Sequence, residues 1–252
     1  MKAQESRMGS NRTGVQMSPL DAKRMNEQRV DLAPPVLQSP SAAAMADMRA
    51  RYIAEAPRIG SVPPPGNVKG VVQTGMAMLS GNRPQLLLDK LGERLAFERS
   101  STRLYDALIT KVRATRSDGD DTLLPLDTLL QHRDEEAEHF ALLAQAIEQL
   151  GGDCTAQTPC ADLAGLESAG LLQAVTDPRT TIVQSLHALL IAEMADCSGW
   201  DMLIAVTQAQ GHDSMARDFV RAASEERAHL QQVRIWFESH TLGTPLSGAA
   251  YA

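Results

Sequence analysis

The 252-residue sequence contains no run of about 18 apolar residues, which is the length that a membrane-spanning helix needs. Its first 30 residues also lack the apolar stretch of a secretory signal. Only three cysteines are present and none of them forms a Cys-x-x-Cys pair, so neither a disulfide framework nor a zinc knuckle is indicated. We therefore expect a cytoplasmic protein with reduced thiols and no membrane contact.

Aromatic residues and positive charge are also scarce. Aromatics make up 4% of the chain, and the formal net charge is −7. Nucleic acid is not expected as a partner, because general binders need an excess of Lys and Arg to displace counterions from phosphate. Leu, Ala, Glu and Gln dominate the second two-thirds of the chain, a composition typical of helices rather than of sheets. The composition predicts an all-α fold.

The chain divides into three predicted regions. Residues 1–82 are rich in Pro, Ser, Asn and Met and show no sustained apolar period, which predicts an irregular extension draped over the main domain. Within this extension, the alanine-rich stretch from Ser41 to Ala56 is expected to form a short helix. Residues 83–240 show helical periodicity and are predicted to form a four-helix bundle, followed by a tail at residues 241–252.

The connections between the four predicted helices indicate their topology. The first and second helices, and the third and fourth, are joined by short connections, so each pair should be antiparallel neighbours. The connection at 151–176 is long enough to bring the third helix back parallel to the second, as one crossover does in a four-helix bundle. The predicted helices run from Pro84 to about Arg116, from near Pro125 to Gly151, from Asp177 as N-cap to Gly211, and from Asp213 to about His240.

Each predicted helix carries one Glu in its inward apolar stripe, and two of them add a His three residues later. Every one of these Glu lies near the middle of its helix, so the side chains should converge in the interior of the bundle. The six candidate ligands are Glu98, Glu136, His139, Glu193, Glu226 and His229. The neighbouring Glu135 and Glu225 are alternative ligands, although the helical stripes favour Glu136 and Glu226.

Four carboxylates in an apolar interior must be protonated, paired or bound to cations. No Lys or Arg lies on the four stripes at that level, and two divalent ions would neutralise the four Glu. Mixed carboxylate and imidazole ligands suit iron or manganese, with zinc as an alternative. Each Glu-x-x-His can then hold its own metal while the other two Glu bridge or close the site.

This pattern resembles the ferritin-like superfamily, and its bacterioferritins and rubrerythrins in particular. The matching residues are Glu98 with Tyr105 seven positions on, Glu136-Ala137-Glu138-His139, Glu193, and Glu226-Arg227-Ala228-His229. The resemblance implies a ferritin-like four-helix bundle, two iron ions, and a catalytic Tyr105 beside them. Asp196 is similar to an extra carboxylate of rubrerythrins, either as a ligand or as a neighbour of the ligands. The rubredoxin cysteines are absent, so any electron donor would be a separate molecule.

The predicted activity is ferrous iron oxidation coupled to the reduction of O₂ or peroxide. One alternative is an oxidase or oxygenase that acts on a small organic substrate, which would need an open apolar channel beside the metals. Another is a non-enzymatic bundle that stores iron or serves as a docking partner. We expect a homo-oligomer, a dimer or larger, although the long amino-terminal arm is unlike that of a cage-forming ferritin.

Overall fold

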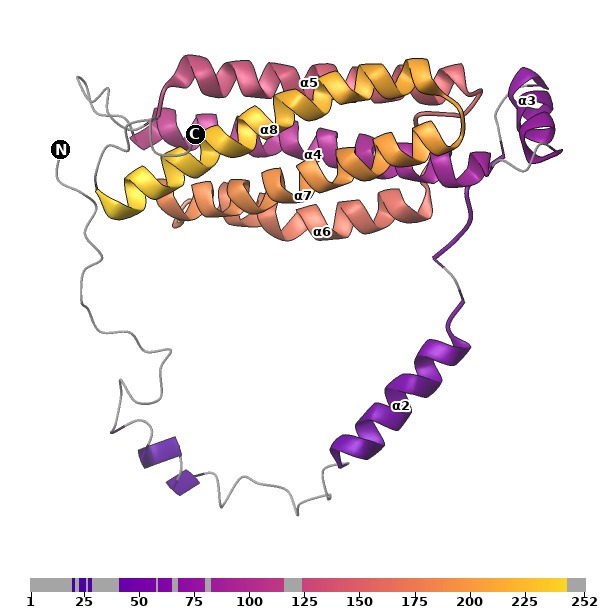
Figure 1. Ribbon diagram of the computed structural model, residues 1–252. Helices are drawn as coiled ribbons and strands as arrows, with labels where there is room; N and C mark the ends of the chain where they lie inside the picture. Colours follow the sequence, from indigo (N-terminus) through magenta and orange to yellow (C-terminus); the bar gives the residue numbers. More distant parts are fainter. Residues whose placement is uncertain are drawn as a thin grey trace. The chain divides into compact units, whose positions relative to one another are not determined.

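The computed structural model describes residues 41–57, 59–64, 68–79, 83–115 and 124–243, together with residues 20, 23–25, 27 and 28. The described residues contain helices and no strand, which confirms the all-α prediction (Figure 1). The chain divides into two compact units, residues 1–58 and residues 59–252. Most of the predicted irregular extension before residue 41, and the predicted tail after residue 243, lie outside the described residues. No described helix is long and apolar enough to cross a membrane.

The first unit contains α2, Ala42–Glu55, which confirms the predicted alanine-rich helix. Ser41 is its N-cap, and the Ser41 hydroxyl accepts a hydrogen bond from the backbone N–H of Ala44. In the second unit, α3, Val68–Leu79, precedes the long helices.

Three of the four long helices begin and end close to the predicted residues. They are α4, Pro84–Thr115; α5, Leu126–Gln149; and α8, Asp213–Leu242. Pro84 opens α4 because a proline at the first helical position loses no hydrogen bond. Gly243 ends α8 in the left-handed conformation, with φ of 66°, which glycine adopts without a steric penalty.

The predicted start of the third long helix was wrong. α7 spans Ile182–Ala209, and its N-cap is Thr181 rather than Asp177. The Thr181 hydroxyl accepts from the backbone N–H of Gln184, and the Gln184 side chain accepts from the N–H of Thr181, so the two residues form a capping box. Asp177 instead caps the end of the preceding helix, and its carboxylate accepts from the N–H of Arg179 in the intervening turn.

The long connection contains a helix that the sequence analysis did not predict. This helix, α6, spans Pro159–Thr176 and begins at Thr158, whose hydroxyl accepts from the N–H of Ala161. It packs against α4 and α7, and buries Ala164 and Val175 there. The crossover between α5 and α7 is therefore an ordered helix that covers the outside of two others.

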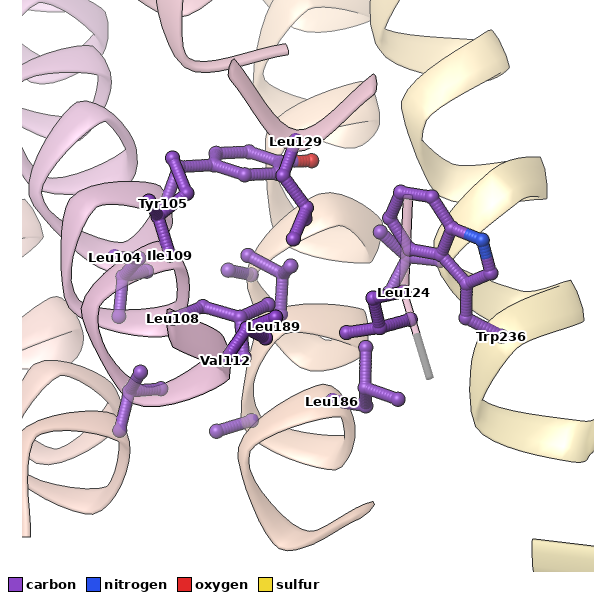
Figure 2. Packing of buried hydrophobic residues seen from close by; sticks show 14 of the residues in the cluster. Leu104, Tyr105, Leu108, Ile109, Val112, Leu124, Leu129, Leu186, Leu189 and Trp236 are labelled. Carbon is purple, nitrogen blue, oxygen red and sulfur yellow. The ribbon is translucent and has the colours of Figure 1, made fainter. Parts of the chain in front are cut away.

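α4, α5, α7 and α8 surround a common interior: α4 contacts α5 and α7, and α8 contacts α7 and α5. Of these four neighbouring pairs, α5 and α8 contact each other least. Two apolar clusters fill the interior, and Figure 2 shows the one that contains Tyr105, Leu129 and Trp236. The second cluster contains Leu91, Leu143, Trp200 and Phe219. A layer of acidic and imidazole side chains lies between these clusters along the helices.

Candidate metal centre

The six predicted ligands meet in the interior. Each of the four Glu side chains is at most 2% exposed, and the two His are 3% and 1% exposed. Their ligand atoms form two groups, and within each group the atoms lie within 4.8 Å of one another. The groups are Glu98, Glu136, His139 and Glu226, and Glu136, Glu193, Glu226 and His229. These buried Glu and His side chains could hold metal ions.

Glu136 and Glu226 belong to both groups, whereas Glu98 and Glu193 each belong to one. From the sequence, we expect the Glu of each Glu-x-x-His to serve its own metal and the other two Glu to bridge or close the site. If two ions are bound, membership in both groups would instead make Glu136 and Glu226 the shared carboxylates, with Glu98 and Glu193 at the two ends.

Many polar atoms of this layer have no hydrogen-bond partner among the described residues, which is a strong sign that a ligand belongs there. Both carboxylate oxygens of Glu136 and of Glu226 are unpaired, as is Nδ1 of His139 and of His229. His139 Nδ1 lies 2.6 Å from Glu226 Oε1, yet the pair lacks hydrogen-bond geometry. Unpaired carboxylate and imidazole atoms that lie this close together are typical of a metal site without its metal. The residues therefore fit a metal site.

In the protein without metal, two of the four acids favour the protonated form. Burial and the nearby Glu226 raise the pKa of Glu193 to about 8, and the same causes raise that of Glu136 well above its ordinary value. Burial alone would raise the pKa of Glu226, but His139 and His229 outweigh it and lower the pKa to about 2. Burial would lower the pKa of both His, but contact with Glu226 raises each to about 9.

The two imidazoles are oriented by carboxylates outside the two groups. Nε2 of His139 lies 2.8 Å from Glu225 Oε2, and Nε2 of His229 lies 2.7 Å from Glu135 Oε2. An Nε2–H that donates to a carboxylate leaves the Nδ1 lone pair facing the interior, which is the usual arrangement around metal-bound His. Glu135 and Glu225, which were alternative ligands in the sequence, thus hold the far side of each ring.

A buried cation, Arg94, contradicts the expectation that no Lys or Arg lies at this level. Arg94 is 3% exposed, donates to Glu98 Oε1 at 2.9 Å, and forms a second ion pair with Asp196. Asp196 is 1% exposed and belongs to neither group of ligands. Arg94 is thus paired with one carboxylate inside the two groups, Glu98, and with one outside them, Asp196.

Gly199 makes room for the Arg94 side chain. A Cβ at this position would overlap the Arg94 guanidinium, so any larger residue would displace it. Arg94 also lies over the Phe97 ring, 4.7 Å from its centroid, and near the Trp200 ring, 5.9 Å away. The guanidinium therefore lies near two aromatic rings, and one of its terminal nitrogens donates to the carboxylates of Glu98 and Asp196.

Tyr105 is fully buried beside one end of the site. Its hydroxyl donates to Glu193 Oε1 at 2.7 Å and lies 3.3 Å from Nδ1 of His132. Burial and the Glu193 carboxylate raise the pKa of Tyr105 well above its ordinary value, so the phenol keeps its proton. His132 stacks on His229 with ring centroids 4.2 Å apart, and burial lowers the pKa of His132 to about 4.

Arg94 and His132 were not predicted from the sequence, for the same reason. Arg94 lies four residues before Glu98, and His132 lies four residues before Glu136. Residues spaced by four share one helical face, so this offset was a usable signal. Polar residues at these positions could equally have faced solvent, which is why the pattern alone did not single them out.

A surface pocket of about 480 Å³ lies outside the ligand layer, between α5 and α8. Five of its seven lining residues are acidic, and Leu130 is the one apolar side chain among them. The lining residues are Asp127, Leu130, Gln131, Asp134, Glu135, Glu138 and Glu225. Because Glu135 and Glu225 also contact the ligand imidazoles, the pocket adjoins the site.

No protein-family model matches the chain, and no curated protein or solved structure matches it either. The interpretation of the site therefore depends on its geometry and chemistry. Its defining features are two groups of candidate ligands that share two carboxylates, two imidazoles that are each held by a further carboxylate, and the buried ion pair between Arg94 and Asp196.

Proposed function

We propose that this chain is a ferritin-like di-iron protein that oxidises ferrous iron with O₂ or peroxide. The observation that carries the proposal is the pair of ligand groups that share Glu136 and Glu226. Three carboxylates and one imidazole in each group are a ligand set that suits iron or manganese, and zinc accepts it as well. Iron bound there would supply electrons to O₂ or peroxide through its ferrous and ferric states.

The roles of the protein groups follow from their contacts. Glu98 with His139 and Glu193 with His229 would hold one ion each, and Glu136 and Glu226 would contact both. Glu135 and Glu225 keep each Nδ1 directed inward. Arg94 fixes Glu98, and Tyr105 fixes Glu193 through its hydroxyl. A catalytic role of Tyr105 is part of this proposal.

Metal binding would exchange protons for cations. His139 and His229 have a pKa of about 9 in the metal-free protein, so both carry protons at neutral pH. Each must lose the Nδ1 proton before that nitrogen can bind a metal, and the proton passes to solvent. Apolar clusters lie on both sides of the site and would limit the access of water; one contains Leu91 and the other contains Trp236.

The acidic pocket favours iron over an organic substrate. An oxidase or oxygenase for a small organic molecule would need an apolar entrance, whereas the described pocket offers carboxylates and a single Leu. Carboxylates attract ferrous ions and raise their local concentration. The same acids are compatible with iron storage, which sizing with light scattering would test, because a monomer or dimer excludes a storage cage.

The direct test is metal analysis followed by anaerobic ferrous loading and exposure to O₂ or peroxide. The wild-type protein should bind close to two iron ions and oxidise them. Replacing both Glu136 and His139 by Ala should abolish loading and oxidation, whereas Glu148→Ala, at an exposed position of the same helix outside the pocket, should change neither. Unchanged metal content in the double variant would refute the proposal.

A further inference from the structure

His132 is a buried imidazole that the di-iron proposal does not use. It is 6% exposed, stacks on the ligand His229, and lies near the Trp236 ring. A buried imidazole is retained at a stability cost unless it has a polar role. Its neighbours indicate what that role is.

The hydrogen bonds of Tyr105 define the tautomer of His132. A phenol has one proton, and Tyr105 donates it to Glu193 Oε1 at 2.7 Å. The contact of 3.3 Å between the Tyr105 oxygen and His132 Nδ1 therefore requires that Nδ1–H be the donor. A neutral imidazole with a proton on Nδ1 has its lone pair on Nε2, so His132 can bind a cation through that atom.

The ligand atoms of His132, Glu135 and His229 form a third group, again within 4.8 Å of one another. Two imidazoles and one carboxylate are a common ligand set for a divalent transition metal. We propose that these three residues form an outer cation site through which divalent metal ions pass on their way to the centre. The outer site is inferred from its own three residues, and only its role in loading rests on the proposed di-iron function.

His229 belongs to both the outer site and the inner one. Its Nε2 lies 2.7 Å from Glu135, and its Nδ1 lies 3.4 Å from Glu136 and 3.5 Å from Glu226. A neutral imidazole has one lone pair, so His229 can bind a metal on one side at a time. The outer site is consequently a transit site that empties as the inner site fills.

Comparison of α5 with α8 explains why the outer site exists at one end of the centre. Both helices carry a Glu-Glu-x-x-His sequence, at residues 135–139 and 225–229. The residue four positions before the shared Glu is His132 on α5 but Ala222 on α8. His132 therefore adds a third candidate ligand to the pair formed by Glu135 and His229. The matching pair, Glu225 and His139, has no third ligand because Ala222 stands at that position.

The acidic pocket adjoins this end of the centre as well as the end at Glu225. Glu135 lines the pocket, and its side chain is 26% exposed, so its carboxylate reaches both solvent and the buried His229. Asp127, Asp134 and Glu138 line the same pocket and add negative charge. A cation drawn into the pocket can thus reach Glu135, whose group also includes His132 and His229.

Cobalt(II) is a suitable probe, because its visible absorption reports imidazole and carboxylate coordination. In the full-length chain, E136Q with E226Q removes both shared carboxylates of the inner site with little change in shape. This double variant should still bind one Co²⁺, and adding either H132F or E135Q should abolish that binding. Circular dichroism and thermal melting would show that each variant folds. Absence of Co²⁺ binding in the folded double variant, or its survival after H132F, would overturn the proposal.

A kinetic experiment tests the transit role, with E148Q as the matched control. Glu148 is an exposed acid of α5 that does not line the pocket, so E135Q and E148Q remove the same charge from the same helix. E135Q should slow Co²⁺ loading of the otherwise native protein about tenfold while leaving the final stoichiometry at two. E148Q should leave the rate within about twofold of the native value. Equal slowing in both variants would overturn the transit role, whereas a native protein that takes up no metal pair would refute the di-iron proposal instead.

Discussion

Glu135 on α5 accepts a hydrogen bond from Nε2 of His229 on α8, at 2.7 Å. The opposite pair, Glu225 on α8 and His139 on α5, makes the same contact at 2.8 Å. Each Glu-Glu-x-x-His segment thus orients the imidazole of the other segment rather than its own. The two helices with the least mutual contact around the interior are joined through these polar pairs, and the ligand geometry depends on both helices being in place.

Removing one of these crossed contacts should weaken metal binding. Glu225→Ala leaves His139 free to rotate, so we expect the affinity for one of the two metals to fall about 10- to 100-fold. Glu225→Gln keeps an acceptor and should retain most of the affinity. Competition with a chelator of known affinity measures the change. Equal affinities of the Ala and Gln variants would contradict an orienting role.

Replacing Arg94 should destabilise the metal-free protein strongly. Arg94→Met leaves Glu98 and Asp196 buried without their cation, and breaking such a pair typically costs about 3–5 kcal/mol. Arg99→Met, at an exposed position of the same helix, should change the free energy of unfolding by less than about 0.5 kcal/mol. Urea denaturation in the presence of chelator measures both. A loss below about 1 kcal/mol for Arg94→Met would show that the ion pair is not required for folding.

Gly199→Ala should act through the same guanidinium. The added methyl group would overlap Arg94, so we expect a loss of about 1–3 kcal/mol from displaced side chains. Gly170→Ala in α6 is a matched helical control with open space around the new Cβ, and it should stabilise the protein by up to about 1 kcal/mol. Thermal melting of the two variants would compare them directly. The same sign for both would contradict the packing argument.

Tyr105→Phe tests the hydrogen bond to Glu193. The substitution keeps the ring in its apolar cluster but leaves Glu193 Oε1 and His132 Nδ1 without their partner, for a loss of about 1–3 kcal/mol. If Tyr105 also takes part in the reaction, iron oxidation should slow in this variant while the metal content stays near two. Native oxidation rates with reduced stability would assign Tyr105 a purely structural role.

The stability of the metal-free protein should decrease as the pH rises from about 5 to 9. Glu193 has a pKa of about 8 in the folded chain, against an ordinary value of 4.5, and His139 and His229 have about 9 against 6.5. Between these values the folded state binds more protons than the unfolded state, so raising the pH favours unfolding. Two lowered pKa values act in the opposite sense: that of Glu226 between about pH 2 and 4.5, and that of His132 between about pH 4 and 6.5. In the second interval, the raised pKa values of Glu136 and Glu193 outweigh the single imidazole.

Bound metal should remove this dependence, because cations take the place of the protons and bind more tightly as the pH rises. Melting temperatures measured at pH 5.5, 7 and 8.5, with chelator and with Mn²⁺, would test the expectation. His187→Gln replaces an exposed imidazole of α7 and should leave both trends unchanged. A melting temperature in chelator that rises across this range would contradict the assigned protonation states.

The main helices and the inward Glu and His residues could be predicted because they depend on local pattern. Pro84 marks the start of α4, and the helical period places Glu98 on the same stripe as Leu91 and Leu95. The start of α7 was wrong because Asp177 and Thr181 are both good N-cap residues. The choice between them depends on the turn after α6, where Lys111 of α4 donates to the backbone carbonyls of Asp177 and Thr180.

The helical period was enough to predict that the chain is helical and that four Glu and two His face the interior, because a period of 3.6 residues fixes which side chains share a face. It could not predict that Glu136 and Glu226 belong to both groups, that Arg94 is paired with Asp196, or that Glu135 reaches His229. Those relationships depend on the rotation of each helix about its axis and on its register along its neighbour. Packing of the whole interior sets both quantities, and no single segment encodes them.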